Sequence, residues 1–171
     1  MAKPMGRDNR RPRGGGPREP REFDQKVIEI KRVSRTVKGG KRMRFRALVV
    51  IGDHKGKVGM GLRKGLDVPE SVQKAVSAAK KNMTHIIIQN GTIPHETRVK
   101  YKASSVFLKP ASPGTGVIAG GAVRQLLELA GVKNVLSKMY GSRNKVNSLM
   151  ATFEALKQME NPQTKKEQRK A

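Results

Sequence analysis

The chain has 171 residues, and its 37 Lys and Arg against 13 Asp and Glu give a formal net charge of +24 at pH 7. So large a positive field attracts polyanions, which points to nucleic acid as the partner. Aromatic residues are scarce and Trp is absent, which argues against a membrane-surface protein, and no apolar run reaches the roughly 20 residues of a membrane-spanning helix. Cys is also absent, which argues against export to an oxidising compartment. The expected location is therefore the cytoplasm.

Charge and composition divide the chain into four parts. Residues 1–22 hold four prolines, three consecutive glycines and six arginines, which predicts a disordered basic tail, and residues 161–171 predict a shorter charged tail. Between the tails, periodic apolar blocks predict two small domains at residues 23–86 and 87–160. Each is near the lower limit of what a single hydrophobic core can support.

The first domain is predicted to be a meander of three strands followed by a helix. Side chains alternate between apolar and polar along each strand. The predicted strands are residues 26–35, 44–51 and 57–62. Gly39 and Gly40 supply the positive φ angles of a tight hairpin turn between the first two. Pro69 suits the first turn of a helix, and apolar residues recur at helical spacing from Val72 to Met83, which places a helix on one face of the sheet.

The second domain is predicted to be an α+β unit of strands covered by two helices. Gly131 ends the first of these helices, and Leu149 and Leu156 lie on the apolar face of the second. The predicted elements are a strand at residues 99–108, a glycine-rich turn, a helix at 117–130, a strand at 132–138, the second helix, and a further strand at 85–88. The fold class of the whole chain is therefore α+β.

The first hairpin carries the strongest local indication of function. Nine basic residues and one acid, Glu29, lie between Lys26 and Arg46. Arg42, Arg44 and Arg46 point the same way along a rigid strand at a spacing of roughly 6.6 Å, which suits a row of phosphates. The alternative is a solvated hairpin with surface charge, but solvated faces usually mix charge signs, so the imbalance favours nucleic acid.

The order of strands and helix in the first domain is similar to that of a double-stranded-RNA-binding domain whose first helix is missing or reduced. Such domains recognise RNA by its shape, its phosphates and its 2′-hydroxyls. Arg63 and Lys64 extend the basic surface, whereas the lysines of the helix fit an ordinary solvated face. Few aromatic residues are present to stack on unpaired bases, which also argues against a single-strand binder.

A glycine-rich segment at residues 109–124 is the second candidate site. A glycine-rich turn that opens a helix can bind an anion. Gly114, Gly116 and Ala119 fit a loose dinucleotide-binding pattern, but no acid follows to hold a ribose, and Ala122 stands where a phosphate-binding loop needs Lys. A tight turn with close helix packing explains most of these glycines at least as well as phosphate contact.

No catalytic or metal-binding constellation is found. His54, His85 and His95 are isolated, Cys is absent, and no acids have metal-ligand spacing. We therefore expect no enzyme activity, no cofactor, no metal and no small-molecule substrate. A small-molecule kinase is only a distant alternative, because the glycine-rich segment lacks the lysine that such an enzyme uses to bind a phosphate.

Several motifs, in this order, resemble those of protein five of the bacterial small ribosomal subunit, a universal ribosomal family. They are RVSRTVKGGKR at residues 32–42, VIGD at 50–53, GKVG at 56–59, NGT at 90–92, GTGVIAGG at 114–121 and YGS at 140–142. The resemblance covers about residues 23–160. It implies an N-terminal domain related to double-stranded-RNA-binding domains and a C-terminal domain with a left-handed βαβ crossover, an exception to the usual right-handed rule.

The resemblance also implies a function. Members bind small-subunit rRNA where head and body meet, contact ribosomal proteins four and eight, and contribute to decoding accuracy, with the hairpin loop near the spectinomycin site. The expected rRNA-binding residues are Arg32, Ser34, Arg35, Thr36, Lys38, Gly39, Gly40, Lys41, Arg42, Arg44, Arg46, Lys55, Lys57, Arg63 and Lys64. The expected protein-interface residues are Gly114, Thr115, Gly116 and Arg124. A free-standing RNA-binding or RNA-chaperone protein is the alternative.

Two positions depart from the family pattern. Lys145 and Met150 stand where members commonly have Pro and Arg, so an rRNA contact of that arginine does not carry over. The long tail at residues 1–22 also lies outside the common family core.

Overall fold

The computed structural model describes residues 23–159, so both predicted tails, at residues 1–22 and 161–171, lie outside the described residues. The first sheet contains β1 (Asp24–Val37), β2 (Gly40–Gly52), β3 (Lys57–Gly65) and β4 (Met83–His85), with α1 (Val68–Lys81) between β3 and β4. The second sheet has the order β5 (Thr97–Tyr101), β6 (Ser104–Pro110), β8 (Val135–Gly141), β7 (Val117–Ile118). Its helices are α2 (Gly121–Ala130) and α3 (Lys145–Lys157). The predicted α+β class is confirmed, and none of the helices within residues 23–159 could cross a membrane.

The first sheet is the predicted antiparallel meander, with α1 packed on one face. Ala47, Val49 and Ile51 of β2 form a small buried cluster with Ala75 and Ala79 of α1. Because strand side chains alternate, these three residues of β2 share a face.

Two details at the end of α1 differ from the prediction. The helix ends at Lys81 and is capped by Asn82, so Met83 begins β4 instead of extending the apolar face of the helix. Of the predicted strand at residues 85–88, only His85 is in β4, which pairs with β3, while Ile86 turns into the core.

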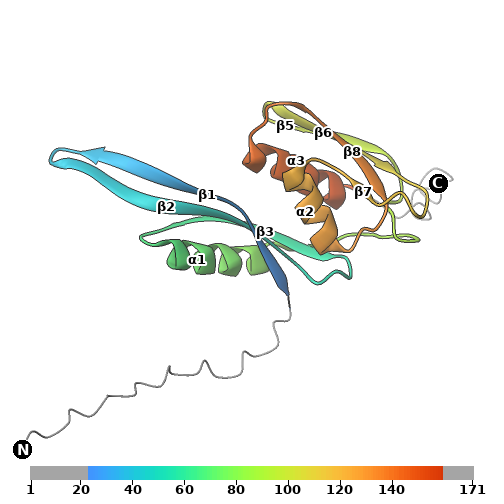
Figure 1. Ribbon diagram of the computed structural model, residues 1–171, viewed down its shortest axis with the longest axis horizontal. Coiled ribbons are helices and arrows are strands. Elements are labelled where there is room, and N and C mark those ends of the chain that lie inside the picture. The colour runs from blue at the N-terminus through green and yellow to red at the C-terminus, as the bar shows by residue number, and fades with distance from the viewer. Residues whose placement is uncertain (1–22, 160–171) are drawn as a thin grey trace, which may run out of the picture.

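The other face of the first sheet is buried by the second half of the chain. Leu48 and Val50 of β2 belong to the main core cluster together with Leu126 and Leu127 of α2. In Figure 1, α2 lies between the two sheets, and it contacts β1, β2 and β3 as well as β7. The two halves therefore share one continuous core, whereas the sequence predicted two separate small cores.

The second half has two boundaries that differ from the prediction. The predicted single strand at residues 99–108 is a hairpin of β5 and β6, which turns at Lys102 with φ 53°. The predicted helix at residues 117–130 begins only at Gly121, because Val117 and Ile118 form β7. Since β7 runs parallel to β8 and α2 joins them, the segment is a βαβ unit. The helix ends, as predicted, at Gly131, which has φ 90°.

An ion-pair network joins the two halves at the surface. Glu128 of α2 accepts hydrogen bonds from Lys26 of β1 at 2.8 Å and from Arg124 at 2.9 Å. His54 Nε2 lies 3.0 Å from Asp24 Oδ2, and His54 Nδ1 lies 2.8 Å from the Glu128 carbonyl oxygen. The hydrogen bonds from Lys26 and Arg124 hold the pKa of Glu128 below its usual value.

This network predicts a pH-dependent contribution to stability. A carboxyl group whose pKa is lower in the folded than in the unfolded state stabilises the fold above its unfolded pKa, and the contribution disappears as the pH falls through the folded pKa. We expect Glu128→Gln to lower the free energy of unfolding by about 1 kcal/mol at pH 7, since the pair is partly exposed. Urea unfolding over a pH series should show the difference shrinking below the ordinary Glu pKa of 4.5.

Glu154→Gln is the control for this prediction, because Glu154 makes no ion pair with any residue of the described part of the chain. A loss in Glu128→Gln that stays constant across the pH series would contradict the assignment.

Candidate nucleic-acid interface

The β1–β2 hairpin extends well beyond the body of the molecule (Figure 1). Strands β1 and β2 pair from Asp24 and Gly52 to Val37 and Gly40, and the register shifts once, at a bulge between Val27 and Glu29. The third strand ends opposite Phe45, so the distal part of the hairpin is a two-stranded ribbon. Side chains of residues 34–44 are exposed there, which leaves them free to contact a partner.

The strand register sorts the predicted contact residues onto two faces of this ribbon. Residues that pair across an antiparallel ladder place their side chains on the same face. Arg42 pairs with Arg35, Arg44 with Val33, and Arg46 with both Lys31 and Lys64. We call this the arginine face; its cations are Lys31, Arg35, Arg42, Arg44, Arg46 and Lys64. The opposite face carries Arg32, Ser34, Thr36, Lys41 and Arg63.

Most of this charge has no internal counter-ion. Glu29 Oε1 lies 3.4 Å from Lys31 Nζ and 3.9 Å from Lys145 Nζ. Within residues 23–159, none of the other hairpin cations from Arg32 to Arg46 forms an ion pair. Uncompensated, exposed cations on a rigid ribbon are suited to neutralising the phosphates of a nucleic acid. Through its ion pair with Glu29, Lys145 at the start of α3 contacts the hairpin. Met150, the other residue that departs from the family pattern, packs against the core.

The hairpin tip differs from the prediction at one of its two glycines. Lys38 and Gly39 form the turn. Gly40 has φ 135°, whereas Gly39 does not have a positive φ, so only Gly40 uses a conformation that other residues rarely adopt. A Cβ atom at either position would meet nothing within 4 Å. The expectation that both glycines need such a conformation is therefore wrong for Gly39.

The two glycines should respond differently to the same substitution. We expect Gly40→Val to introduce about 1 to 3 kcal/mol of local strain and to increase amide exchange at the tip. Gly39→Val is the matched control, because it adds the same side chain to open space without that strain. Hydrogen exchange of the hairpin amides measures both variants, and equal effects would contradict the assigned conformations.

Lys55 lies in the turn between β2 and β3, and Lys57 is the first residue of β3, at the opposite end of the first sheet from the hairpin tip. The 12 steps of β2 place them roughly 40 Å from the tip. Asp53 Oδ1 accepts the backbone N–H groups of Lys55 at 2.7 Å and Lys57 at 2.9 Å, which shapes the turn. Burial raises the pKa of Asp53, but these N–H donors outweigh it and leave the pKa below its usual value. The structure therefore does not bring these two lysines to the hairpin site, whereas Arg63 and Lys64 lie at the base of the hairpin.

The glycine-rich segment is held by a side chain that the sequence analysis missed. The N–H groups of Gly114 and Gly116 both donate to Asn134 Oδ1, at 3.1 and 3.0 Å. These amides are therefore not available to a phosphate. Both glycines have positive φ and open space at Cβ, so a turn, and not close packing, explains them. In the sequence Asn134 follows another polar residue, Lys133, and nothing in the local pattern indicates its role.

Of the two other predicted interface residues, Thr115 lies in the same turn, with its Oγ1 3.2 Å from Ser112 Oγ, and Arg124 Nε donates to Glu128 Oε1 on its own helix at 2.9 Å. A second cluster that the sequence analysis did not single out lies on the second sheet. It contains Arg98, Lys100 and Tyr140, and its sign in the sequence is the alternation of Arg98, Lys100 and Lys102 at strand spacing.

Among residues 23–159, no group of His, Asp and Glu could hold a metal ion.

Comparison with known proteins gives matches over both halves of the chain. Residues 23–87 match the model of the ribosomal protein S5 N-terminal domain, and residues 99–169 match that of the C-terminal domain. The small ribosomal subunit protein uS5 of Thermotoga maritima is 50% identical over 141 residues, which is 82% of this chain and 79% of the relative. The protein of the same name from Thermus thermophilus is 54% identical over 138 residues, which is 81% of this chain and 85% of the relative.

Proposed function

Because the chain belongs to the ribosomal protein S5 family, and is thus a structural protein of the small ribosomal subunit, we propose that it binds small-subunit rRNA through the β1–β2 hairpin. The observation that carries the proposal is the exposed, uncompensated charge of the hairpin. In this proposal the hairpin lies between rRNA segments of the head and of the body of the subunit, and it stabilises the position of the head relative to the body.

The two faces of the hairpin have different roles in this proposal. The arginine face neutralises phosphates, since guanidinium groups bind phosphate oxygens in a bidentate manner. On the opposite face, the hydroxyls of Ser34 and Thr36 are neutral partners for ribose or phosphate, beside Arg32 and Lys41. At the tip, the backbone around Gly39 and Gly40 allows close approach of a sugar–phosphate strand.

The remaining predicted contacts form separate parts of the interface. Arg63 and Lys64 extend the hairpin site at its base, and Lys55 and Lys57 contact a different rRNA segment at the far end of the sheet. We also propose that the division into residues 23–86 and 87–160 separates a part that is mainly an RNA-binding module from a part that also contacts proteins. The protein has no catalytic role in this proposal.

The turn at Gly114, Thr115 and Gly116 is the proposed contact with ribosomal protein four, and protein eight is a second proposed neighbour. The turn uses its amides internally and has no cation of its own, which suits a protein surface better than a phosphate. A subunit that changes conformation during decoding is biased by any contact that is stronger in one state than in the other.

A substitution in this turn should therefore alter accuracy. In this proposal the contact is stronger in the open state of the subunit, so Gly114→Arg, which weakens it, should ease closure and raise misreading of near-cognate codons, measured with a reporter in cells. Gly114→Ala is the control, because it shares the backbone strain at φ 93° without the bulk and charge. Unchanged misreading by Gly114→Arg at full ribosome occupancy would contradict the interface; reduced occupancy in both variants would mean that the turn serves only the fold.

Binding of the purified full-length chain to RNA tests the main proposal. The expected result is tighter binding to small-subunit rRNA than to an unrelated RNA of equal length at the same salt concentration. Equal affinity for both RNAs would favour a free-standing RNA-binding or chaperone protein and would overturn the proposal.

A further inference from the structure

The second sheet has one covered and one open face. Helix α3 packs on β5 and β6, and α2 contacts β7, all on the side where Val99, Val106 and Leu108 point into the core. Because strand side chains alternate, the intervening residues point away from the helices. The register places Lys100, Ser105 and Tyr140 side by side across three strands, with Arg98 in the next row.

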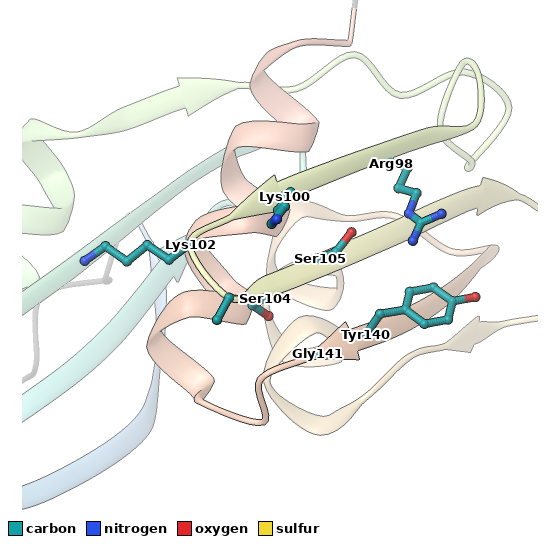
Figure 2. A pocket seen from close by; sticks show the side chains of 8 residues that line it. Arg98, Lys100, Lys102, Ser104, Ser105, Tyr140 and Gly141 are labelled. Atoms are coloured by element: carbon teal, nitrogen blue, oxygen red, sulfur yellow. The ribbon is translucent and has the colours of Figure 1, made fainter.

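These residues line an open hollow of about 800 Å³. Figure 2 shows Arg98, Lys100, Ser105 and Tyr140 on adjacent strands, while Lys102 extends away from them at the β5–β6 turn. The Arg98 guanidinium lies 5.1 Å from the centre of the Tyr140 ring, a cation–π contact that orients both side chains. Tyr140 is nevertheless 46% exposed, so much of its ring is accessible.

All of the charged side chains that line the hollow are positive. Its polar side chains are two cations near the centre, a third at the rim, and the hydroxyls of serine and tyrosine, and no carboxylate lines it. Within residues 23–159, Arg98, Lys100 and Lys102 form no ion pair. Such a surface offers hydrogen-bond donors to an anion with several acceptor oxygens, next to an aromatic ring.

We propose that this hollow binds the sugar–phosphate backbone of an RNA segment and is a contact surface separate from the hairpin. Arg98 and Lys100, two residues apart on β5, are spaced roughly 6.6 Å along the strand and hold phosphate oxygens. Ser105 donates to a phosphate or ribose oxygen, and the accessible part of the Tyr140 ring stacks on an unpaired base or sugar. The proposal rests on the proposed function, because it takes RNA as the partner.

An RNA occupant fits this surface better than a protein occupant. The centres of protein interfaces are depleted of charge and enriched in apolar area. On the open face, half-buried Phe107 lies between Arg98 and Lys138, and the exposed residues Leu136 and Ile118 pair with each other at the opposite end of β8 from Tyr140. None of these apolar residues lines the hollow, whose polar side chains are cations and hydroxyls.

Salt-dependent binding of the full-length chain to small-subunit rRNA tests the proposal. Replacing both cations, Arg98→Ala with Lys100→Ala, should flatten the slope of log affinity against log salt concentration by about 1.5, the value for two phosphate contacts. The control pair is Lys133→Ala with Lys157→Ala, which removes the same charge from exposed positions outside the hollow. A slope equal to that of the control pair would overturn the proposal.

The same experiment separates this inference from the proposed function. If the unmodified chain binds rRNA and the hairpin variants flatten the slope while the Arg98 and Lys100 variant does not, only the present inference fails. If the unmodified chain shows no preference for small-subunit rRNA, the proposed function fails.

Photo-crosslinking identifies the occupant in the assembled subunit. A benzophenone amino acid at position Tyr140 keeps an aromatic ring at the hollow, and the same probe at Lys133 is the control. We expect a crosslink to rRNA from the first position and not from the second. A crosslink from the first position to protein alone would overturn the proposal in favour of an acidic protein segment.

Discussion

Removing three arginines from the arginine face should reduce the affinity for small-subunit rRNA by a factor on the order of 100 in 0.1 M salt. The variant combines Arg35→Ala, Arg42→Ala and Arg44→Ala, whose side chains lie on one face of the distal ribbon. Each lost phosphate contact flattens the slope of log affinity against log salt concentration by about 0.7 to 0.9, so the triple variant should lose roughly 2 to 3. Filter binding over a salt series measures both quantities.

The fold itself should not change in this variant. All three side chains are exposed and make no ion pair within the described part of the chain, so circular dichroism and the melting temperature should match those of the unmodified protein. The control replaces Lys80, Lys133 and Lys157, which removes three charges from exposed positions elsewhere. If both triple variants lowered the slope equally, binding would depend on net charge and not on the hairpin.

Leu48→Ala should lower the free energy of unfolding by about 3 kcal/mol. Leu48 is 1% exposed and lies on the face of β2 that α2 covers. Truncating it removes buried apolar surface and leaves a cavity between two halves of the chain that are far apart in sequence. Because the core is continuous, we expect one unfolding transition, a melting temperature lower by on the order of 10 °C, and faster amide exchange in α1 and α2 together.

Met43→Ala is the control for Leu48→Ala, since Met43 lies on the same strand but is 52% exposed. It should change the stability by less than about 0.5 kcal/mol. Two separate transitions in Leu48→Ala, with amide exchange in α2 unaffected, would mean that the halves unfold independently and would contradict the shared core.

Local patterns in the sequence were enough to predict the hairpin, the third strand and α1. Alternation along a strand and glycines at a turn are properties of neighbouring residues, so they can be read directly. The shared core depends on tertiary contacts. Leu48 and Val50 indicate that a second face of β2 is apolar, but nothing near them in the sequence identifies α2, more than 70 residues later, as the element that covers it.

The errors in the second half have physical causes of the same kind. The turn at Lys102 contains no glycine, asparagine or proline, so the hairpin of β5 and β6 resembled one long strand. Val117 and Ile118 fit a helical pattern, but their pairing with β8 makes them a strand. Short apolar segments are ambiguous between helix and strand, and the neighbouring strand decides.

The candidate site was predictable in composition but not in arrangement. Counting charges identified the hairpin, whereas the strand register was needed to separate the arginine face from the face of Ser34 and Thr36. Lys55 and Lys57 were grouped with the hairpin because they are close to it in the sequence. In the structure they lie at the end of the first sheet that is opposite the hairpin tip. The role of Asn134 depends on a side chain reaching a turn some 20 residues away, which no local pattern encodes.

Sedimentation of the tagged full-length chain with the small ribosomal subunit at high salt tests whether the hairpin anchors the chain to rRNA. Structural rRNA binding predicts that the unmodified chain stays with the subunit in stoichiometric amount, and that the variant lacking Arg35, Arg42 and Arg44 is washed off at a lower salt concentration. Release of the unmodified chain from the subunit at the same salt concentration as the triple variant would contradict rRNA binding through the hairpin.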